Sequence, residues 1–316
     1  MEEPALHQPS RRQLTQGTSP RPPRSRRFRS LRTALLTLCA AVLAVALSAG
    51  IHSAADARSA ATSPVASVPS ATASAAEAMP GPVVSSGPVD AELDTEISSI
   101  IDAHGEYQIG VALLDLSGGT VHEYGVQEAF VAASTAKVLA AEAYYNLTES
   151  GAASLADPLG DYTAEFQLQE MIQQSDNDSW SLIMDAVGHA ELTDYAASIG
   201  VDYDPETNTL TASEMARILA GLYGGDLLDG QDTAQLLGLM QDTNYETLIP
   251  AAVPAGVRVF HKYGLLGGEL HDAAILEKDG RAYAFVVYTK GEDLLSVPDR
   301  TEVIHQLTAA VTDALF

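Results

Sequence analysis

The chain has 316 residues, which is enough for one or two domains. Its charge is divided unevenly: residues 1–32 hold eight arginines and two glutamates, whereas residues 90–316 hold 38 acidic and eight basic side chains. A body with about thirty net negative charges argues against nucleic acid as a partner, because phosphate binding depends on clusters of Lys and Arg.

Residues that bind metals or form disulfides are scarce in this acidic body. Cys39 is the only cysteine and falls in an apolar run, so residues 90–316 have no disulfide, no thiol nucleophile and no cysteine metal site. His261 and His271 are too few and too separated to indicate zinc, and they form no helical His-x-x-x-His pair. We therefore expect neither a metal nor a cofactor.

The first part of the chain predicts an exported protein. Residues 1–32 are rich in Arg, Pro and Ser, which is typical of a disordered arm. Residues 33–51 carry no charge and nearly span a bilayer core as a helix, with the arginine-rich side in the cytoplasm. They are a transmembrane anchor or a secretory signal; their length slightly favours the anchor, and both alternatives export the body. Residues 52–89, rich in Ala, Ser and Pro, are a flexible linker.

The folded body is expected from residue 90 to residue 316. Ala91–His104 has the apolar spacing of an amphipathic helix. Tyr107–Leu116 and Thr120–Tyr124 are strand-like and are separated by a glycine turn. Phe130–Leu147 begins as a short apolar run and then takes the pattern of a helix.

The rest of the body is predicted to be helical first and then strand-rich. The expected helices are Gln167–Gln174, Ser179–Val187, Ala212–Tyr223 and Asp232–Leu239. The expected final elements are strands Val257–Tyr263, His271–Glu277 and Arg281–Thr289 and a closing helix from about Arg300 to Leu315. This order predicts an α/β (α+β) fold in which one antiparallel sheet is flanked by the N- and C-terminal helices, with an all-helical subdomain inserted between the strands.

One hydroxyl and one amine stand where they can react together. Ser134 lies at the predicted start of the helix in Phe130–Leu147, and Lys137 lies three residues on, on the same helix face. A serine hydroxyl needs a neighbouring base to act as a nucleophile, and a lysine whose pKa is lowered by burial can be that base. The unpaired N–H groups of a helix start also suit an oxyanion. Alone, the pair is more typical of a helix-capping serine followed by a surface lysine.

Two further segments make the pattern specific. Ser175-Asp176-Asn177 falls between predicted helices, and Lys262-Tyr263-Gly264 falls at the end of a predicted strand. Ser-x-x-Lys, Ser-Asp-Asn and Lys-[Thr/Ser]-Gly, in this order, form the motif set of class A β-lactamases and penicillin-binding proteins. From Asp90 to Phe316 the sequence therefore resembles the class A β-lactamase-like serine hydrolases, whose fold is the β-lactamase/transpeptidase fold.

The resemblance implies four catalytic residues. Ser134 would be the acylated nucleophile and Lys137 its base. Ser175 would relay a proton to the leaving nitrogen, and Lys262 would keep the site electropositive for a substrate carboxylate. Each role depends on the resemblance as well as on the residue type.

The resemblance also implies a substrate-binding set. Asn177 would hydrogen-bond the amide side chain of the substrate, and Tyr263 and Gly264 would belong to the substrate-binding strand. The backbone N–H groups of Ser134 and Leu265 would form the oxyanion hole. An ordinary helix-capping turn is the alternative for the Ser-Asp-Asn segment.

Three positions near the third motif depart from the family pattern. Tyr263 stands where the family has Thr or Ser, so its ring points away or narrows the pocket. The following strand offers no arginine for the substrate carboxylate; Arg258 is a possible substitute or simply a surface arginine. His261 is expected either to titrate or to face solvent.

The largest departure is a shortened omega loop. Class A β-lactamases carry on this loop a glutamate and an asparagine that position the water for hydrolysis of the acyl-enzyme. The corresponding segment, Val201–Leu210, is too short for the full loop. Glu206 and Asn208 are the only residues in it that could imitate the pair, and their spacing differs, so Glu206 is interpreted as a turn residue.

The function expected from these patterns is an exported serine hydrolase, acylated at Ser134 by a β-lactam or an acyl-D-alanyl substrate and slow in deacylation. Two alternatives stay open: a non-catalytic cell-wall binding module and a D-Ala-D-Ala carboxypeptidase. The expected partners are a β-lactam or a small peptidoglycan-derived substrate, and the membrane through residues 33–51. A monomer is expected.

Overall fold

The computed structural model describes residues 89–316. The predicted arm, the apolar segment 33–51 and the linker up to residue 88 lie outside the described residues, so the statements about them stay predictions. Within residues 89–316, no helix has both the length and the apolar character that crossing a membrane requires.

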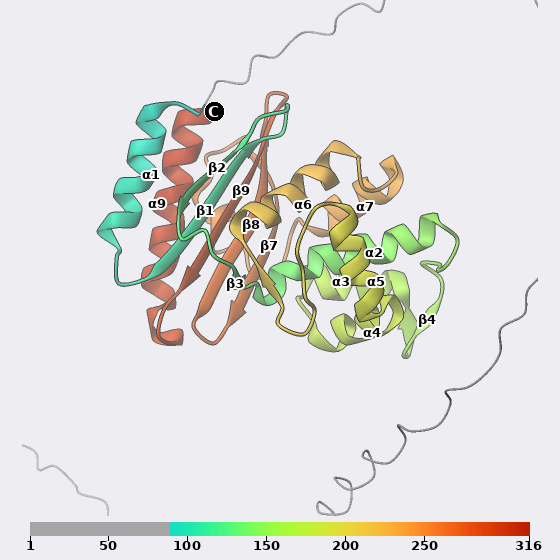
Figure 1. Cartoon of the computed structure of the whole chain (residues 1–316). Coiled ribbons are helices and arrows are strands. Elements are labelled where there is room, and N and C mark those ends of the chain that lie inside the picture. The colour runs from blue at the N-terminus through green and yellow to red at the C-terminus, as the bar shows by residue number, and fades with distance from the viewer. Residues whose placement is uncertain (1–88) are drawn as a thin grey trace, which may run out of the picture. The chain divides into compact units, whose positions relative to one another are not determined.

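Five antiparallel strands form the central sheet. They are β1 (Gln108–Asp115), β2 (Val121–Gly125), β7 (Arg258–Leu266), β8 (Glu269–Lys278) and β9 (Arg281–Lys290). Their order across the sheet is β2-β1-β9-β8-β7, so strands from the two ends of the body meet at the β1–β9 pair (Figure 1). The prediction of one antiparallel sheet is confirmed.

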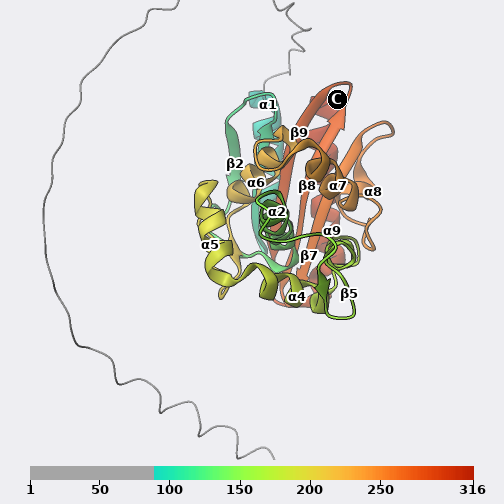
Figure 2. The same cartoon turned by 90° about the vertical axis from the view of Figure 1, so that its right-hand side faces the viewer.

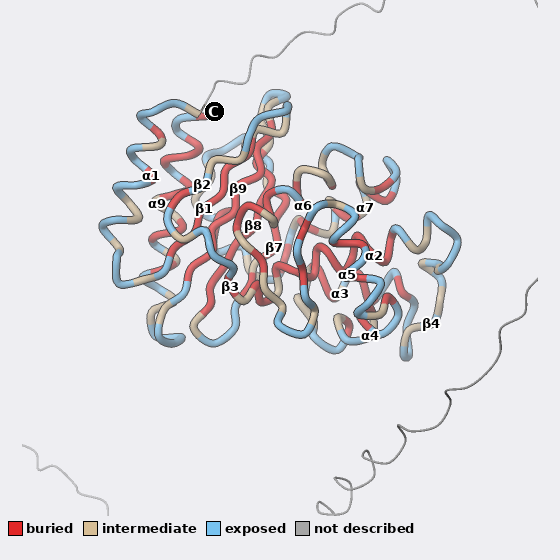
Figure 3. The backbone as a smooth tube through the Cα atoms, viewed as in Figure 1, coloured by how far each residue is buried: buried red, intermediate tan, exposed pale blue. Residues whose placement is uncertain are grey.

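Side chains of this sheet serve two cores, because successive residues of a strand point to opposite faces. On β9, Val286 belongs to the core on one face and Val287 to the core on the other. Both are fully buried, as is most of β8 and β9 (Figure 3). Helices therefore cover both faces of the sheet.

The first and last helices cover one face. α1 (Ala91–Ala103) begins after Asp90, whose carboxylate accepts the backbone N–H of Leu93 at 3.0 Å and caps the helix. α9 (Val297–Leu315) lies beside α1 (Figure 1). Leu93 and Leu307 are both buried in the core that these helices share with the sheet, so the predicted flanking helices are confirmed.

The inserted helices cover the other face, which Figure 2 views from the helical side. They are α2 (Lys137–Glu149), α3 (Ala164–Gln173), α4 (Asn177–Val187), α5 (His189–Ser198), α6 (Ala212–Gly224) and α7 (Gly230–Leu239). α6 packs directly on β1 and β9, and α2 packs on α4. The predicted capping box of α6 is present, with Thr211 and Glu214 as its two members.

Short elements that the sequence patterns did not separate complete the body. β3 (Phe130–Val131) pairs with β6 (Thr209–Leu210), and β4 (Pro158–Leu159) pairs with β5 (Tyr162–Thr163). The 3₁₀ turns are η1 (Ala133–Ala136) and η2 (Leu294–Ser296), and α8 (Ile249–Ala252) is a single helical turn. The β3–β6 pair ties the segment before Ser134 to the shortened loop.

Candidate active site

The candidate nucleophile lies on a tight turn. Ser134 belongs to η1, which leads from β3 into α2. Ala133 just before it has a φ of 50°, a left-handed conformation that strains a residue with a Cβ. Ser134 therefore stands at a helix start as expected, with one 3₁₀ turn before the α-helix.

Buried contacts from the sheet hold this turn in place. The hydroxyls of Thr135 and Tyr288 lie 2.7 Å apart. Nε2 of His271 donates to the Val131 carbonyl at 2.9 Å, and its Nδ1 accepts the backbone N–H of Thr289. Burial lowers the pKa of His271 to about 4, so the ring is neutral and has one nitrogen free to accept. The turn thus has a rigid support on β8 and β9.

The amine of Lys137 is fully buried at the start of α2. Its Nζ donates to Asn177 Oδ1 at 2.8 Å and to the Ser175 carbonyl at 2.6 Å, and lies 3.4 Å from Ser175 Oγ. Burial lowers the pKa of Lys137 to about 8, although Asp176 opposes the shift. Its acceptors all belong to the Ser-Asp-Asn segment, and Ser134 Oγ is not among them.

The hydroxyl of Ser175 lies between two lysines. Nζ of Lys262 donates to Ser175 Oγ at 2.9 Å, opposite the amine of Lys137. Burial lowers the pKa of Lys262 well below its usual value, and repulsion by Lys137 lowers it further, whereas Asp272 raises it. A hydroxyl between two amines that lose protons readily can pass a proton from one partner to another.

The third motif meets the nucleophile turn at Gly264. A Cβ added to Gly264 would lie 3.1 Å from the Ala132 carbonyl oxygen and 3.2 Å from the Ser134 backbone nitrogen, so glycine is the residue that fits without displacement. Leu265, the next residue of β7, lines the same cleft as Ser134. The two backbone N–H groups expected to form an oxyanion hole therefore come from segments in direct contact.

A cleft of about 360 Å³ opens beside the candidate nucleophile. Its lining residues are Ala133, Ser134, Asn177, Trp180, Ser181, Asn208, Leu265 and Leu266. Ser134, Asn177 and Leu265 thus share one opening. Lys137 connects to it through its hydrogen bond to Asn177, and Lys262 connects to Lys137 through the Ser175 hydroxyl.

Tyr263 does not line this cleft. Its hydroxyl donates to Asn244 Oδ1 at 2.9 Å, and its ring lies against Tyr245, with centroids 4.8 Å apart. Nζ of Lys262 lies 4.0 Å from the centre of the same ring. Of the two expectations, the structure shows the ring pointing away from the cleft. Tyr263 therefore supports the residues around it instead of lining the cleft as a substrate-binding residue.

Arg258 does not replace the missing arginine. It forms an ion pair with Glu277 at 2.9 Å at the end of β7 remote from Gly264, and its side chain is largely exposed. The interpretation as a surface arginine is confirmed by this geometry.

Glu206 and Asn208, the two candidate residues of the shortened loop, lie in different places. The carboxylate of Glu206 is exposed and lies 2.9 Å from His189 Nδ1, away from the cleft. Asn208 lines the cleft, and its Nδ2 donates to the Ala133 carbonyl at 3.1 Å while its Oδ1 accepts from Tyr203. The loop therefore supplies an amide next to Ser134 and keeps its glutamate outside.

Two site features escaped the sequence analysis. Trp180, the only tryptophan, lines the cleft one helical turn after Asn177, with its ring centre 5.4 Å from Lys137 Nζ. The three-residue spacing from Asn177 to Trp180 could have indicated that both side chains face the cleft. His261 does not face solvent as one expectation had it: it is 1% exposed and is bonded to Asp272.

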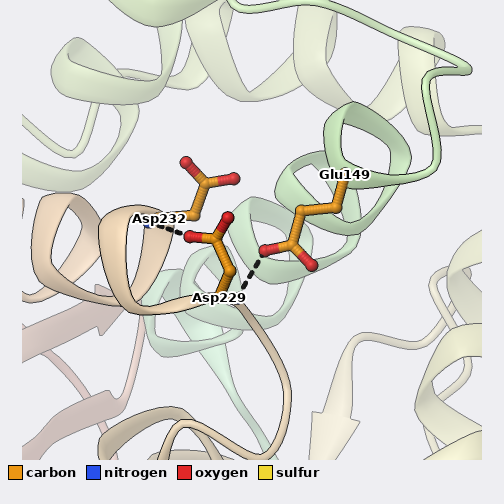
Figure 4. Close-up of side chains that lie close together, drawn as sticks. All are labelled: Glu149, Asp229 and Asp232. Atoms are coloured by element: carbon orange, nitrogen blue, oxygen red, sulfur yellow. Dashed lines mark hydrogen bonds between the residues drawn. The ribbon is translucent and has the colours of Figure 1, made fainter.

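Away from the cleft, three carboxylates from α2 and α7 approach within 4.8 Å of one another (Figure 4). Glu149 Oε1 accepts the backbone N–H of Asp229 at 2.6 Å, and Asp229 Oδ1 accepts that of Asp232 at 2.9 Å. Thr148 donates to Asp232 at 3.4 Å. These bonds cap α7 and join it to α2, so helix capping accounts for the cluster.

Comparison with known proteins places the chain in a family. Residues 92–315 match the model of the beta-lactamase enzyme family. Because this match covers most of the chain, the protein belongs to that family. Its fold and the order of its motifs agree with the class A β-lactamase-like branch, with Tyr263 as the departure in the third motif. No curated protein matches the chain.

Solved structures with the same fold include both β-lactamases and a penicillin-binding protein. A mutant of PBP-A in an acyl-enzyme complex with penicillin G is 24% identical over 71% of this chain and 96% of its own, with a TM-score of 0.66. A mutant of the class A β-lactamase of the last common ancestor of Gram-negative bacteria is 26% identical over 70% of this chain and 98% of its own, with a TM-score of 0.64. A β-lactamase from Xanthomonas campestris pv. campestris is 23% identical over 71% and 98%, with a TM-score of 0.66.

Proposed function

We propose that the protein is an exported serine hydrolase that is acylated at Ser134 by β-lactam or acyl-D-alanyl substrates. The observation that carries the proposal is the Ser175 hydroxyl between Lys137 and Lys262, two residues before Asn177, which lines the same cleft as Ser134. Membership of the family and the acyl-enzyme formed by the similar PBP-A support the same chemistry.

Acylation would proceed in balanced proton transfers. Ser134 Oγ attacks the carbonyl carbon, a C–O bond forms, and the hydroxyl proton passes to neutral Lys137. The C–N bond then breaks, and the nitrogen takes the proton of the Ser175 hydroxyl, which Lys262 or Lys137 reprotonates. Lys137 must turn from its present acceptors towards Ser134, as catalytic hydrogen bonds often do only when substrate binds.

Slow deacylation is proposed because the cleft lacks a carboxylate that could act as a general base for water. None of the described residues that line the cleft carries a carboxylate, and Glu206 is paired with His189 outside it. Loss of a water-activating base costs about 10²–10⁴-fold in rate. The acyl-enzyme is therefore expected to accumulate.

Intact-protein mass spectrometry after addition of penicillin tests both parts. We expect the wild-type chain to gain the mass of one penicillin within minutes and to lose it over hours, and Ser134→Ala to gain nothing. A wild-type chain without an adduct, or an adduct that persists in Ser134→Ala, rules the proposal out.

The carboxypeptidase alternative shares this acylation step. Incubation with a muropeptide ending in D-Ala-D-Ala separates the two. Only a carboxypeptidase releases D-alanine many times over within the lifetime of the penicillin adduct. A binding module without chemistry would bind the muropeptide and form no adduct.

Export through residues 33–51 is part of the proposal. These residues are apolar and uncharged, and a basic segment precedes them. Protease added to intact cells should degrade residues 90–316 if the body is outside; a body that stays protected until the cells are lysed contradicts export.

A further inference from the structure

A buried histidine next to Lys262 is held between two carboxylates. Nδ1 of His261 lies 2.8 Å from Asp272 Oδ1 on the neighbouring strand β8. Its Nε2 lies 3.1 Å from Glu246 Oε1 and 3.0 Å from the hydroxyl of Thr243. Because both ring nitrogens face carboxylate oxygens, the geometry suits an imidazolium that donates from each nitrogen.

The charge of this ring follows from its surroundings. Burial disfavours the charged form, but Asp272 and then Glu246 outweigh it and raise the pKa of His261 to about 9. The same contacts lower the pKa of Glu246. The side chain of Lys262, the next residue, points to Ser175 on the opposite face of β7.

The histidine fastens the segment 241–248, which joins α7 to α8. The backbone N–H of His261 donates to the Met240 carbonyl at 2.7 Å, where the segment begins. The backbone N–H of Ile249 donates to Asp272 Oδ2 at 3.0 Å, where the segment ends.

Within the segment, Glu246 also accepts the N–H and the hydroxyl of Thr243, at 2.6 and 2.7 Å. His305 of α9 contacts the Thr247 carbonyl at 2.8 Å from outside.

The same segment holds the turn that carries Ser175. The backbone N–H of Asn244 donates to the Gln173 carbonyl, and its Nδ2 donates to the Gln174 carbonyl, both at 2.9 Å. Oδ1 of Asn244 accepts the Tyr263 hydroxyl. Ser175 follows directly with a φ of 55°, a strained conformation that neighbouring contacts must maintain.

We propose that His261 is a positioning residue for acylation: clamped by Asp272 and Glu246, it fixes the segment 241–248, and Asn244 of that segment fixes the Ser175 hydroxyl between Lys137 and Lys262. The chain of contacts runs from β8 through β7 and the segment to the Ser175 turn. None of its members touches the cleft. The inference rests on the proposed acylation of Ser134.

Two exposed positions test this chain of contacts without disturbing the core. Glu246→Gln removes the carboxylate charge from His261, and Asn244→Ala removes the side-chain link to Gln174 and Tyr263. Asp242→Asn is the matched control, because Asp242 is exposed on the same segment, and asparagine tolerates its φ of 52°. All three variants are made in the full chain and reacted with penicillin, and formation of the adduct is followed by mass spectrometry.

The expected signature is a loss of rate without a loss of binding. The maximal acylation rate should fall about tenfold in each variant, because a misplaced proton relay slows the chemical step, while the penicillin concentration for half-maximal rate stays within about twofold. Asp242→Asn should match the wild type. The double variant should also be about tenfold slower rather than about a hundredfold slower, because both changes cut one path.

An independent readout is the titration of the ring itself. NMR of histidine side chains should give a pKa of about 9 for His261 in the wild type and Asn244→Ala, and a lower one in Glu246→Gln. Acylation of both variants at the wild-type rate, or fully additive losses in the double variant, overturns the inference while the acylated wild type upholds the proposed function. A wild type that forms no adduct overturns both.

Discussion

Among single residues, Lys137 has the pKa that should govern acylation. Burial lowers that pKa to about 8, and the amine must be neutral to accept the proton of Ser134. The acylation rate at saturating penicillin should therefore rise about tenfold per pH unit up to about pH 8 and then level off. Quenched reactions analysed by mass spectrometry measure this profile.

Lys137→Ala provides the control for this profile. The rate should fall by about 10²–10⁴-fold, which is the usual contribution of a general base, and the slope below pH 8 should disappear. If the variant keeps the slope, another group titrates and Lys137 is not the base.

Glu142 is the residue with the clearest cost to stability. It is fully buried on α2, and neither carboxylate oxygen has a hydrogen-bond partner among the described residues. Burial raises its pKa well above the usual value, so the folded protein keeps the proton that the unfolded chain releases above about pH 4.5. The free energy of unfolding therefore falls as pH rises from there towards the folded pKa.

Glu142→Gln removes this ionisation and keeps the shape. The variant should gain about 1–3 kcal/mol of unfolding free energy at pH 7 and little at pH 4.5, measured by urea denaturation. Glu96→Gln on the exposed side of α1 should change it by less than about 0.5 kcal/mol at both pH values. An equal gain at both pH values would show that burial of the side chain, and not its charge, is the cost.

The contact between β7 and η1 is the element-level feature that shapes the cleft. A Cβ on Gly264 would press on the Ala132 carbonyl and the Ser134 nitrogen, each backbone and unable to move aside cheaply. Gly264→Ala should therefore slow acylation about tenfold to a hundredfold and cost about 1–3 kcal/mol of stability. Gly238→Ala is the control, because its Cβ would meet nothing within 4 Å on helix α7 and should be neutral or stabilising. Equal acylation by both variants would contradict the role of this contact.

At the level of elements, the sequence predicted most of this structure and missed what depends on distant contacts. The regular strands and helices were found within about three residues of their ends, because their apolar spacing is a local signal. The separate α5 and the two-residue pairs β3–β6 and β4–β5 were not found, because strands this short have no periodicity. The position of Ser134 was predicted, but its support by His271 and Tyr288 comes from strands more than 130 residues away.

The candidate site was predictable in the same measure. Motif order indicated Ser134, Lys137, Ser175 and Lys262. In the structure Ser134 lines the cleft, and the other three form a hydrogen-bonded group that reaches the cleft at Asn177. The direction of Tyr263, by contrast, is decided by Asn244 and Tyr245 on a loop that no motif marks. The carboxylates around His261 were equally hidden, because Asp272 and Glu246 meet it only through strand pairing and a loop crossing.

The whole body has opposite electrostatic characters near to and far from the cleft. Its 38 acidic and eight basic residues should repel the proposed anionic substrate at long range, whereas the buried lysines, where they are protonated, should attract its carboxylate at short range. The Debye length shrinks from about 30 Å at 0.01 M salt to about 8 Å at 0.15 M, so salt screens the repulsion first. The second-order acylation rate constant for penicillin G should therefore rise about two- to fivefold over this range. A penicillin with an ammonium group on its side chain, and so no net charge, is the matched probe and should change little; a rate constant for penicillin G that falls with salt would mean that the lysines, rather than the acidic body, control the approach.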